Sequence, residues 1–126
     1  MNGLALAYIG DAYYELEVRK HLIESGFTSV NILHNKAINY TSSKAQAEVI
    51  EYLINSETLS EDEMHAFKRG RNNSSSGRKN VDAKTYVLAT GFESLIGYLY
   101  INNKKRLDEI MSLSFKYIEK GKNTMG

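Results

Sequence analysis

Apolar residues recur at steps of three and four along most of this chain, and this periodicity most limits the folds that it can adopt. None of the 126 residues is a proline, so no helix is broken by that route. No Asn-Gly or Asp-Gly dipeptide lies between two apolar runs, and no long alternating run predicts a strand. The sequence therefore predicts an all-α fold in which residues 1–126 form a single domain around one hydrophobic core.

We expect six helices with short polar connections. Gly26 is suited to end the first helix, and Ser60 with Glu63 three residues later is a capping-box pattern that begins the fourth. The segment GRNNSSSGRKN, at about residues 70–80, has no apolar side chain to pack and predicts an exposed, flexible loop. A frayed tail is expected from about residue 121 to 126. The predicted helices span about residues 3–24, 30–40, 42–54, 60 to the loop, 82–100 and 104–120.

Positive charge is concentrated in one segment of an almost neutral chain. The formal net charge is +1, yet no acidic residue occurs between Met64 and Val81. Such a segment suits a polyanionic partner, although a run of charge is usually only a solvated face. The basic residues in this window are Lys68, Arg69, Arg71, Arg78 and Lys79.

The residue types present limit the metal chemistry. The chain has no cysteine, and its three histidines stand at no spacing typical of zinc sites. A bound metal is therefore expected to have oxygen ligands, which favours Mg²⁺, with Mn²⁺ as a substitute. We find no apolar run long enough to span a bilayer and no leader pattern, so a cytoplasmic location is expected.

Two acidic residues occur within apolar helical segments. Asp11 follows Gly10 in the first predicted helix, and Glu93 is the only charged residue between positions 87 and 101. Burying an unpaired carboxylate is very costly, but two carboxylates that face each other across a cation offset that cost. Either acid alone is more often hydrogen-bonded to a tyrosine or turned to a helix edge. Helical steps place Asp11 on one face with Leu4, Ala7, Tyr8, Tyr14 and Val18.

Two further features surround Asp11. A glycine inside a helix costs about 1 kcal/mol relative to alanine, so Gly10 indicates the close approach of another backbone or of a ligand. Glu15 is a candidate to share the site of Asp11, but it lies four residues before Arg19. We favour a surface salt bridge between Glu15 and Arg19.

Several segments resemble the ribonuclease III family. AYIGDAYYELEVRKHL (Ala7–Leu22) is similar to the family signature, and FESLIGYLYI (Phe92–Ile101) is similar to its second motif. YTSSKAQAEVIEYL (Tyr40–Leu53), KRGRN from Lys68 and KNVDAKTYVLATGFE (Lys79–Glu93) resemble the bacterial Mini-III branch, which lacks the double-stranded-RNA-binding domain. The resemblance covers essentially the whole chain.

The resemblance implies a dimerising bundle of ribonuclease III type and a metal-dependent endoribonuclease. Asp11 and Glu93 would be its catalytic residues and ligands of Mg²⁺. Double-stranded RNA would be hydrolysed to 5′-phosphate and 3′-hydroxyl ends. The larger enzymes have further acids at the positions of Ala7 and Thr90 here, so this metal site would contain fewer carboxylates. Support of the site is expected from Gly10, Asp82, Thr85 and Tyr86.

The resemblance also suggests partners. RNA would be contacted by the basic segment and, more weakly, by Lys44 and Gln46. The substrate would be the large-subunit (23S) ribosomal RNA precursor, with a ribosomal protein on that substrate as a candidate partner. The apolar first helix serves either a homodimer interface or the monomer's own core. Two alternatives stay open: a dimer that binds structured RNA without cutting it, and a helical protein-interaction module.

Overall fold

The structure, a computed structural model, describes residues 1–74 and 81–125, and these residues form helices with no strand among them. The prediction of an all-helical fold is confirmed. Predicted and observed helix ends agree within two residues at most positions, because capping residues mark them. The helices are α1 (Gly3–Glu24), α2 (Val30–Thr41), α3 (Ser43–Asn55), α4 (Glu61–Asn73), α5 (Val81–Asn102) and α6 (Lys104–Met125).

Gly26 ends α1 as the sequence predicts. Its φ of +105° lies in the left-handed region that glycine adopts without strain. The N–H of Gly26 donates to the carbonyl of Ile23 at 3.0 Å, and the N–H of Phe27 donates to the carbonyl of Leu22 at 3.2 Å. This pair of bonds is a Schellman motif, which satisfies the last carbonyls of the helix.

The capping box at the start of α4 is also confirmed. The Ser60 hydroxyl accepts from the N–H of Glu63 at 3.2 Å, and the Glu63 carboxylate accepts from the N–H of Ser60 at 2.9 Å. The predicted start of the loop near residue 70 is wrong, because residues 70–73 are helical. Gly70 is buried where α4 meets α5, against Ser94. This packing stabilises the last turn of α4, although the residues there are polar.

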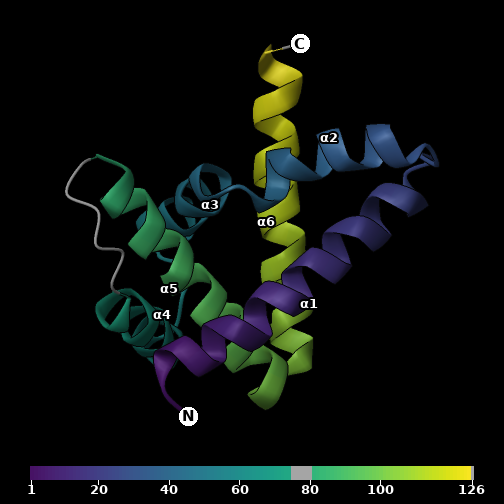
Figure 1. Ribbon diagram of the computed structural model, residues 1–126. Coiled ribbons are helices and arrows are strands. Elements are labelled where there is room, and N and C mark those ends of the chain that lie inside the picture. The colour runs from purple at the N-terminus through teal and green to yellow at the C-terminus, as the bar shows by residue number, and fades with distance from the viewer. Residues whose placement is uncertain (75–80, 126) are drawn as a thin grey trace.

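The last helix is longer than the sequence predicts. The backbone of α6 is helical as far as Met125, so the frayed tail expected from residue 121 is not seen up to that position. Figure 1 shows α6 standing nearly upright behind the other helices and reaching past α2 toward the C-terminus. No helix in the described parts of the chain is both long enough and apolar enough to cross a membrane.

The helix α5 is the centre of the fold. It packs against α1, α3, α4 and α6, and its most extensive contacts are with α1, which crosses it in Figure 1. The apolar side chains of these helices meet in one core. Its completely buried members include Tyr14, Val18, Val49, Ile50, Leu53, Phe67, Phe92, Leu95, Ile96, Leu107 and Ile110.

Glycines bring α1 and α5 into backbone contact. A Cβ atom at Gly10 would collide with the carbonyl oxygen of Glu93, and a Cβ at Gly97 would collide with that of Leu6. The expectation that Gly10 marks a close approach is therefore confirmed. The crossing point also lies beside both acids of interest, since Asp11 follows Gly10 on α1.

The face of α1 on which the sequence places Asp11 with five apolar residues is only partly buried. Ala7, Tyr14 and Val18 are buried as predicted. Leu4 and Tyr8 point to solvent instead, with 49% and 83% of their surface exposed. The buried stripe runs through Gly3, Leu6 and Gly10, because the glycines allow α4 and α5 to approach on that side. Asp11 therefore lies at the edge of the buried face.

Candidate active site

The helix crossing brings Asp11 and Glu93 together. Asp11 is exposed on α1, Glu93 is partly buried on α5, and their side chains form a hydrogen bond. Two carboxyl groups can share a hydrogen bond only when one of them is protonated and donates. These two residues, called the carboxylate pair below, are therefore placed where like charges must be neutralised by a proton or by a cation.

Glu93 has the perturbed acidity that this position implies. Burial, which is the largest cause, acts together with the charge of Asp11 and the hydrogen bond to it to raise the pKa of Glu93 to about 8. A hydrogen bond from Gln46 acts in the opposite direction. A strongly shifted carboxyl next to a second acid is a frequent mark of a functional site.

Gln46 lies inside the protein beside Glu93. Only 2% of its surface is exposed, and its Nε2 also approaches the carbonyl of Thr41 at 3.4 Å. This burial does not support the expectation that Gln46 contacts RNA. The sequence contains one signal of this position, because Gln46 is a polar residue on the same helical face as Ile50 and Leu53.

Glu15 forms the salt bridge that the sequence predicts. Its carboxylate lies 3.7 Å from the Arg19 guanidinium, on the surface of α1. Its negative charge still reaches Glu93 and contributes to raising the pKa of that residue. The positions where larger enzymes have further acids, Ala7 and Thr90, are both buried here.

The carboxylate pair fits a divalent cation of the magnesium type. Among the described residues, no group of three or more acidic, histidine or cysteine side chains gathers into a metal site. Mg²⁺ often needs only one or two carboxylates, because water and substrate phosphates complete its octahedral shell. A cation bound between the two carboxyl groups would offset the repulsion between their like charges.

Three of the predicted supporting residues lie on α5 before Glu93. Asp82 and Tyr86 share the helical face of Glu93, and Tyr86 precedes it by two turns, about 10 Å along the axis. The carbonyl of Tyr86 accepts a hydrogen bond of 3.0 Å from the Thr90 hydroxyl. Thr85 is partly buried in the same two turns. All three come before Glu93 along the chain, in the first two turns of α5.

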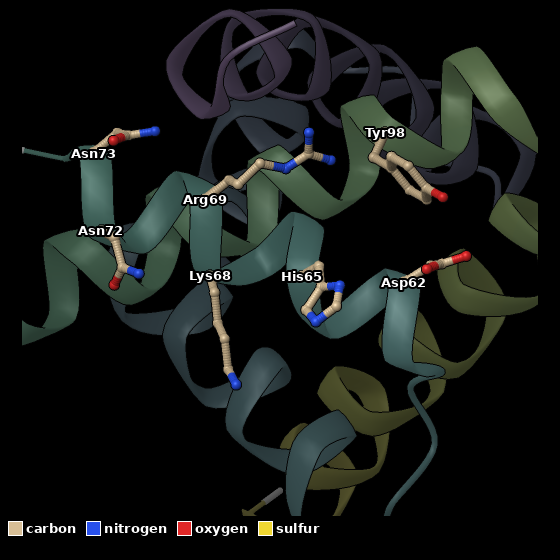
Figure 2. A pocket seen from close by; sticks show the side chains of 7 residues that line it. All are labelled: Asp62, His65, Lys68, Arg69, Asn72, Asn73 and Tyr98. Carbon is tan, nitrogen blue, oxygen red and sulfur yellow. The ribbon is translucent and has the colours of Figure 1, made fainter.

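Lys68 and Arg69 on α4 line a cleft of about 620 Å³ on the outer surface of that helix, called the α4 cleft below. Figure 2 shows the Arg69 guanidinium extending toward the Tyr98 ring, at 5.8 Å from its centroid, whereas Lys68 points away from them. The side chains follow the helix rather than converge on one point. The lining residues are Asp62, His65, Lys68, Arg69, Asn72, Asn73 and Tyr98.

The remaining basic candidates lie apart from this cleft. Arg71 lies over the Phe67 ring at 5.4 Å. Lys44 is exposed on α3 and lines a groove between α2, α3 and α6. Arg78 and Lys79 fall outside the described residues. The structure thus places the carboxylate pair and the α4 cleft on different parts of the surface, with no lining residue in common.

The family model described as the Ribonuclease III domain matches residues 4–104. Both acids of the carboxylate pair lie within the matched segment. The fold and the site therefore define an endoribonuclease of the ribonuclease III class.

Relatives of similar length place the chain in one branch of this family. The chain is 50% identical to the Mini-ribonuclease 3 of Acholeplasma laidlawii, over 96% of this chain and 97% of that protein. It is 47% identical to the Mini-ribonuclease 3 of Enterococcus faecalis, over 94% and 91% of the two chains. A crystal structure of a Fusobacterium nucleatum protein has a similar fold, with a TM-score of 0.80, 27% identity and 92% and 93% coverage. The chain belongs to the Mini-ribonuclease 3 branch of the ribonuclease III family.

Proposed function

We propose that this endoribonuclease hydrolyses double-stranded RNA, with Asp11 and Glu93 as its catalytic residues and as ligands of Mg²⁺. The observation that carries the proposal is the hydrogen-bonded carboxylate pair at the crossing of α1 and α5. Mn²⁺, which also prefers oxygen ligands, is the expected substitute. The products would have 5′-phosphate and 3′-hydroxyl ends.

The two acids have different surroundings and so different tasks. Asp11 is exposed and is the acid that an approaching phosphate and its water molecules meet first. Glu93 is set deeper and is fixed by neighbours on two other helices. When bound, Mg²⁺ supplies an activated water molecule and stabilises negative charge that develops on the phosphate.

The α4 cleft and the segment that follows it would hold the RNA backbone. Proteins recognise duplex RNA mainly through phosphates and 2′-hydroxyl groups, and the cleft offers cationic and amide side chains along one helix. The proposed RNA contacts are Lys68, Arg69, Arg71, Arg78 and Lys79, with Lys44 as a more distant contact.

We further propose a homodimer that acts on the 23S ribosomal RNA precursor in the cytoplasm, with a ribosomal protein on the substrate as a candidate partner. The exposed apolar side chains of α1 support the dimer. Leu4, Tyr8 and Leu16 are spaced by multiples of four residues, and all three face solvent in the single chain. Such a stripe is more apolar than a surface helix requires.

Cleavage of a defined RNA duplex tests the proposed activity. The purified protein should produce fragments in Mg²⁺ and none in excess chelator, with 5′-phosphate ends identified by their sensitivity to a phosphatase. Asp11→Asn and Glu93→Gln should abolish cleavage while they keep the helical circular dichroism spectrum and RNA binding. Wild-type cleavage by either variant would disprove the assignment. Tight duplex binding without fragments would leave the non-catalytic RNA-binding dimer as the function.

A further inference from the structure

A groove of about 730 Å³ lies between α2, α3 and α6, apart from both the carboxylate pair and the α4 cleft. It is called the α6 groove below. In Figure 1, α2 passes across the upper half of α6 and α3 lies beside it. The groove is open to solvent, since Ile38 is 59% exposed and Tyr52 is 37% exposed. The apolar and aromatic side chains that line it include Ile38, Tyr52, Leu113, Tyr117 and Ile118.

Two tyrosines from different helices stack in the α6 groove. The rings of Tyr52 on α3 and Tyr117 on α6 are 4.6 Å apart between centroids, with an angle of 20° between their planes. Each ring therefore holds the other in a fixed orientation. Aromatic side chains in an open groove are stacking partners for the bases of single-stranded nucleic acid, because every base has a flat π-face.

The charge of the α6 groove suits an anion. Three lysines line it, Lys44, Lys116 and Lys120, against one acid, Glu48. Lys44 and Lys116 are exposed, and within the part of the chain that the structure describes their side chains form no hydrogen bond or ion pair. Single-stranded RNA offers both phosphates for these lysines and unpaired bases for the tyrosines. Duplex RNA keeps its bases inside the helix, where an aromatic ring does not reach them.

The helix α3 connects this groove to the proposed active site. One face of α3 is buried in the core and packs against α5, which carries Glu93. Another face lines the α6 groove with Lys44, Glu48 and Tyr52. A helix with its side chains is only about 10–12 Å across. The groove is therefore close enough to receive RNA that continues beyond a duplex held at the carboxylate pair.

We propose that the α6 groove binds a single strand of RNA that flanks the duplex to be cut. Bases of this strand stack on the Tyr52–Tyr117 pair, and its phosphates lie along Lys44, Lys116 and Lys120. The inference rests on the proposed function of the chain as an enzyme that acts on duplex RNA. It adds a second site, which distinguishes a duplex with a single-stranded tail from a blunt one.

Binding of tailed and blunt duplexes tests this proposal. The probes are one blunt RNA duplex and the same duplex with a single-stranded tail at its 3′ ends or at its 5′ ends. Their dissociation constants are measured by fluorescence anisotropy in excess chelator, so that binding is read without cleavage. The wild type should bind one of the tailed duplexes about fivefold or more tighter than the blunt duplex, as stacking of a single base on an aromatic ring provides.

Two variants assign this tail preference to the groove. Tyr52→Leu removes the exposed ring but keeps an apolar side chain, and it should lose most of the preference while its affinity for the blunt duplex stays at the wild-type value. Lys116→Ala changes an exposed position, so it serves as the test if the first variant does not fold. It should also reduce the preference and make tail binding less sensitive to salt.

Tyr100→Leu is the matched control. Tyr100 is also an exposed tyrosine in a pair, 5.2 Å from Tyr13, with Lys104 at 5.1 Å from both rings. These residues do not line the α6 groove. The variant should therefore keep the wild-type ratio between tailed and blunt affinities. An equal loss of the ratio in this control would show that exposed aromatic rings in general have the effect, and would overturn the proposal.

The remaining outcomes separate this inference from the proposed function. Equal binding of tailed and blunt duplexes by the wild type would overturn the inference alone. A tail preference that persists in both Tyr52→Leu and Lys116→Ala would also overturn it, because the tail would then bind elsewhere. A wild type that binds none of the duplexes would disprove the proposed function itself.

Discussion

At the scale of single residues, the proposed chemistry depends on where two ordinary acids, Asp11 and Glu93, are placed. Asp11 and Glu93 belong to helices that cross at glycines, so the backbones that carry their carboxyl groups are held close together. Burial and the proximity of Asp11 together raise the pKa of Glu93. The repulsion between the two carboxyl groups is therefore an unfavourable interaction that a bound cation would relieve.

The acidity of Glu93 predicts a pH dependence of stability in the metal-free protein. The native state keeps a proton on Glu93 up to about pH 8, whereas the unfolded chain loses it near the ordinary value of 4.5. Between these values the native state binds more protons than the unfolded state, so stability falls as pH rises. Urea unfolding in chelator should show this decline, and Glu93→Gln should reduce it. An unchanged slope in that variant would contradict the assignment.

The same residue predicts how metal and pH are linked. Metal binding requires the ionised carboxylate and releases the proton. At limiting Mg²⁺, initial cleavage rates should therefore increase with pH toward about 8. A higher Mg²⁺ concentration should shift the rise to lower pH. A profile that does not move with Mg²⁺ would show that Glu93 does not bind the metal.

At the scale of helices, the α1–α5 contact sets the geometry of the site. Gly10 and Gly97 each face a carbonyl oxygen of the opposite helix. This arrangement replaces side-chain packing by backbone contact over about one turn. The separation of the two backbones that carry the carboxylate pair is therefore set by residues that have no side chain.

Replacing either glycine by alanine should separate the two helices. Gly10→Ala and Gly97→Ala should each destabilise the protein by about 1–3 kcal/mol or more, as overpacking of a core does, and should impair cleavage by displacing Asp11 from Glu93. Gly121→Ala is the control, because Gly121 is helical with open space around it. That change should stabilise the protein by about 0.5–1 kcal/mol. Equal effects at all three sites would disprove the close-contact account.

A buried ion pair joins α4 to α6. Two Arg106 nitrogens donate to the two Glu63 oxygens at 2.8 and 3.0 Å, and Arg106 also donates to the Thr58 carbonyl at 2.7 Å. Burial alone would raise the pKa of Glu63, but the bonds from Arg106 and the Ser60 backbone hold it below its ordinary value. The helix that presents the α4 cleft is anchored at its N-terminus by this pair.

Arg106→Met should therefore be strongly destabilising. It leaves the Glu63 carboxylate buried without its partner, a defect that typically costs about 3–5 kcal/mol. Denaturant unfolding at neutral pH measures the loss. Glu109→Ala removes an exposed partner of the same arginine, 3.1 Å away, and should cost less than about 1 kcal/mol. Similar losses in the two variants would show that the buried pair contributes little.

At the scale of the whole molecule, the single chain leaves an apolar surface uncovered. Tyr8 is 83% exposed and lies on α1 three residues from Asp11. A dimer formed through this stripe would bring two carboxylate pairs near one interface, which suits cleavage of both strands of a duplex. The proposed dimer and the proposed substrate are linked through this surface.

The dimer proposal predicts the effect of a charge on the stripe. Tyr8→Arg should shift the protein toward the monomer in sedimentation equilibrium, because a cation in an apolar interface is costly to bury. Lys105→Ala, an exposed position on α6, should leave the assembly unchanged. A wild-type protein that stays monomeric at high concentration would refute the dimer. An unaltered dimer in Tyr8→Arg would place the interface elsewhere.

The sequence by itself determined the helices, most of their ends and the identity of the two acids. Helix formation depends on bonds between neighbouring turns, so the capping box at Ser60 and the αL residue at Gly26 are visible in the printed sequence. Glu93 is conspicuous in the sequence as the only charged residue between positions 87 and 101.

Only the tertiary structure decided how these parts meet. The burial of Gln46 against Glu93, the exposed position of Tyr8 and the helical state of residues 70–73 depend on which faces of separate helices come into contact. At the helix crossings, glycines let two backbones that are far apart in the sequence come into contact. Periodicity in one helix does not contain this information, because it fixes which residues share a face but not which partner covers it.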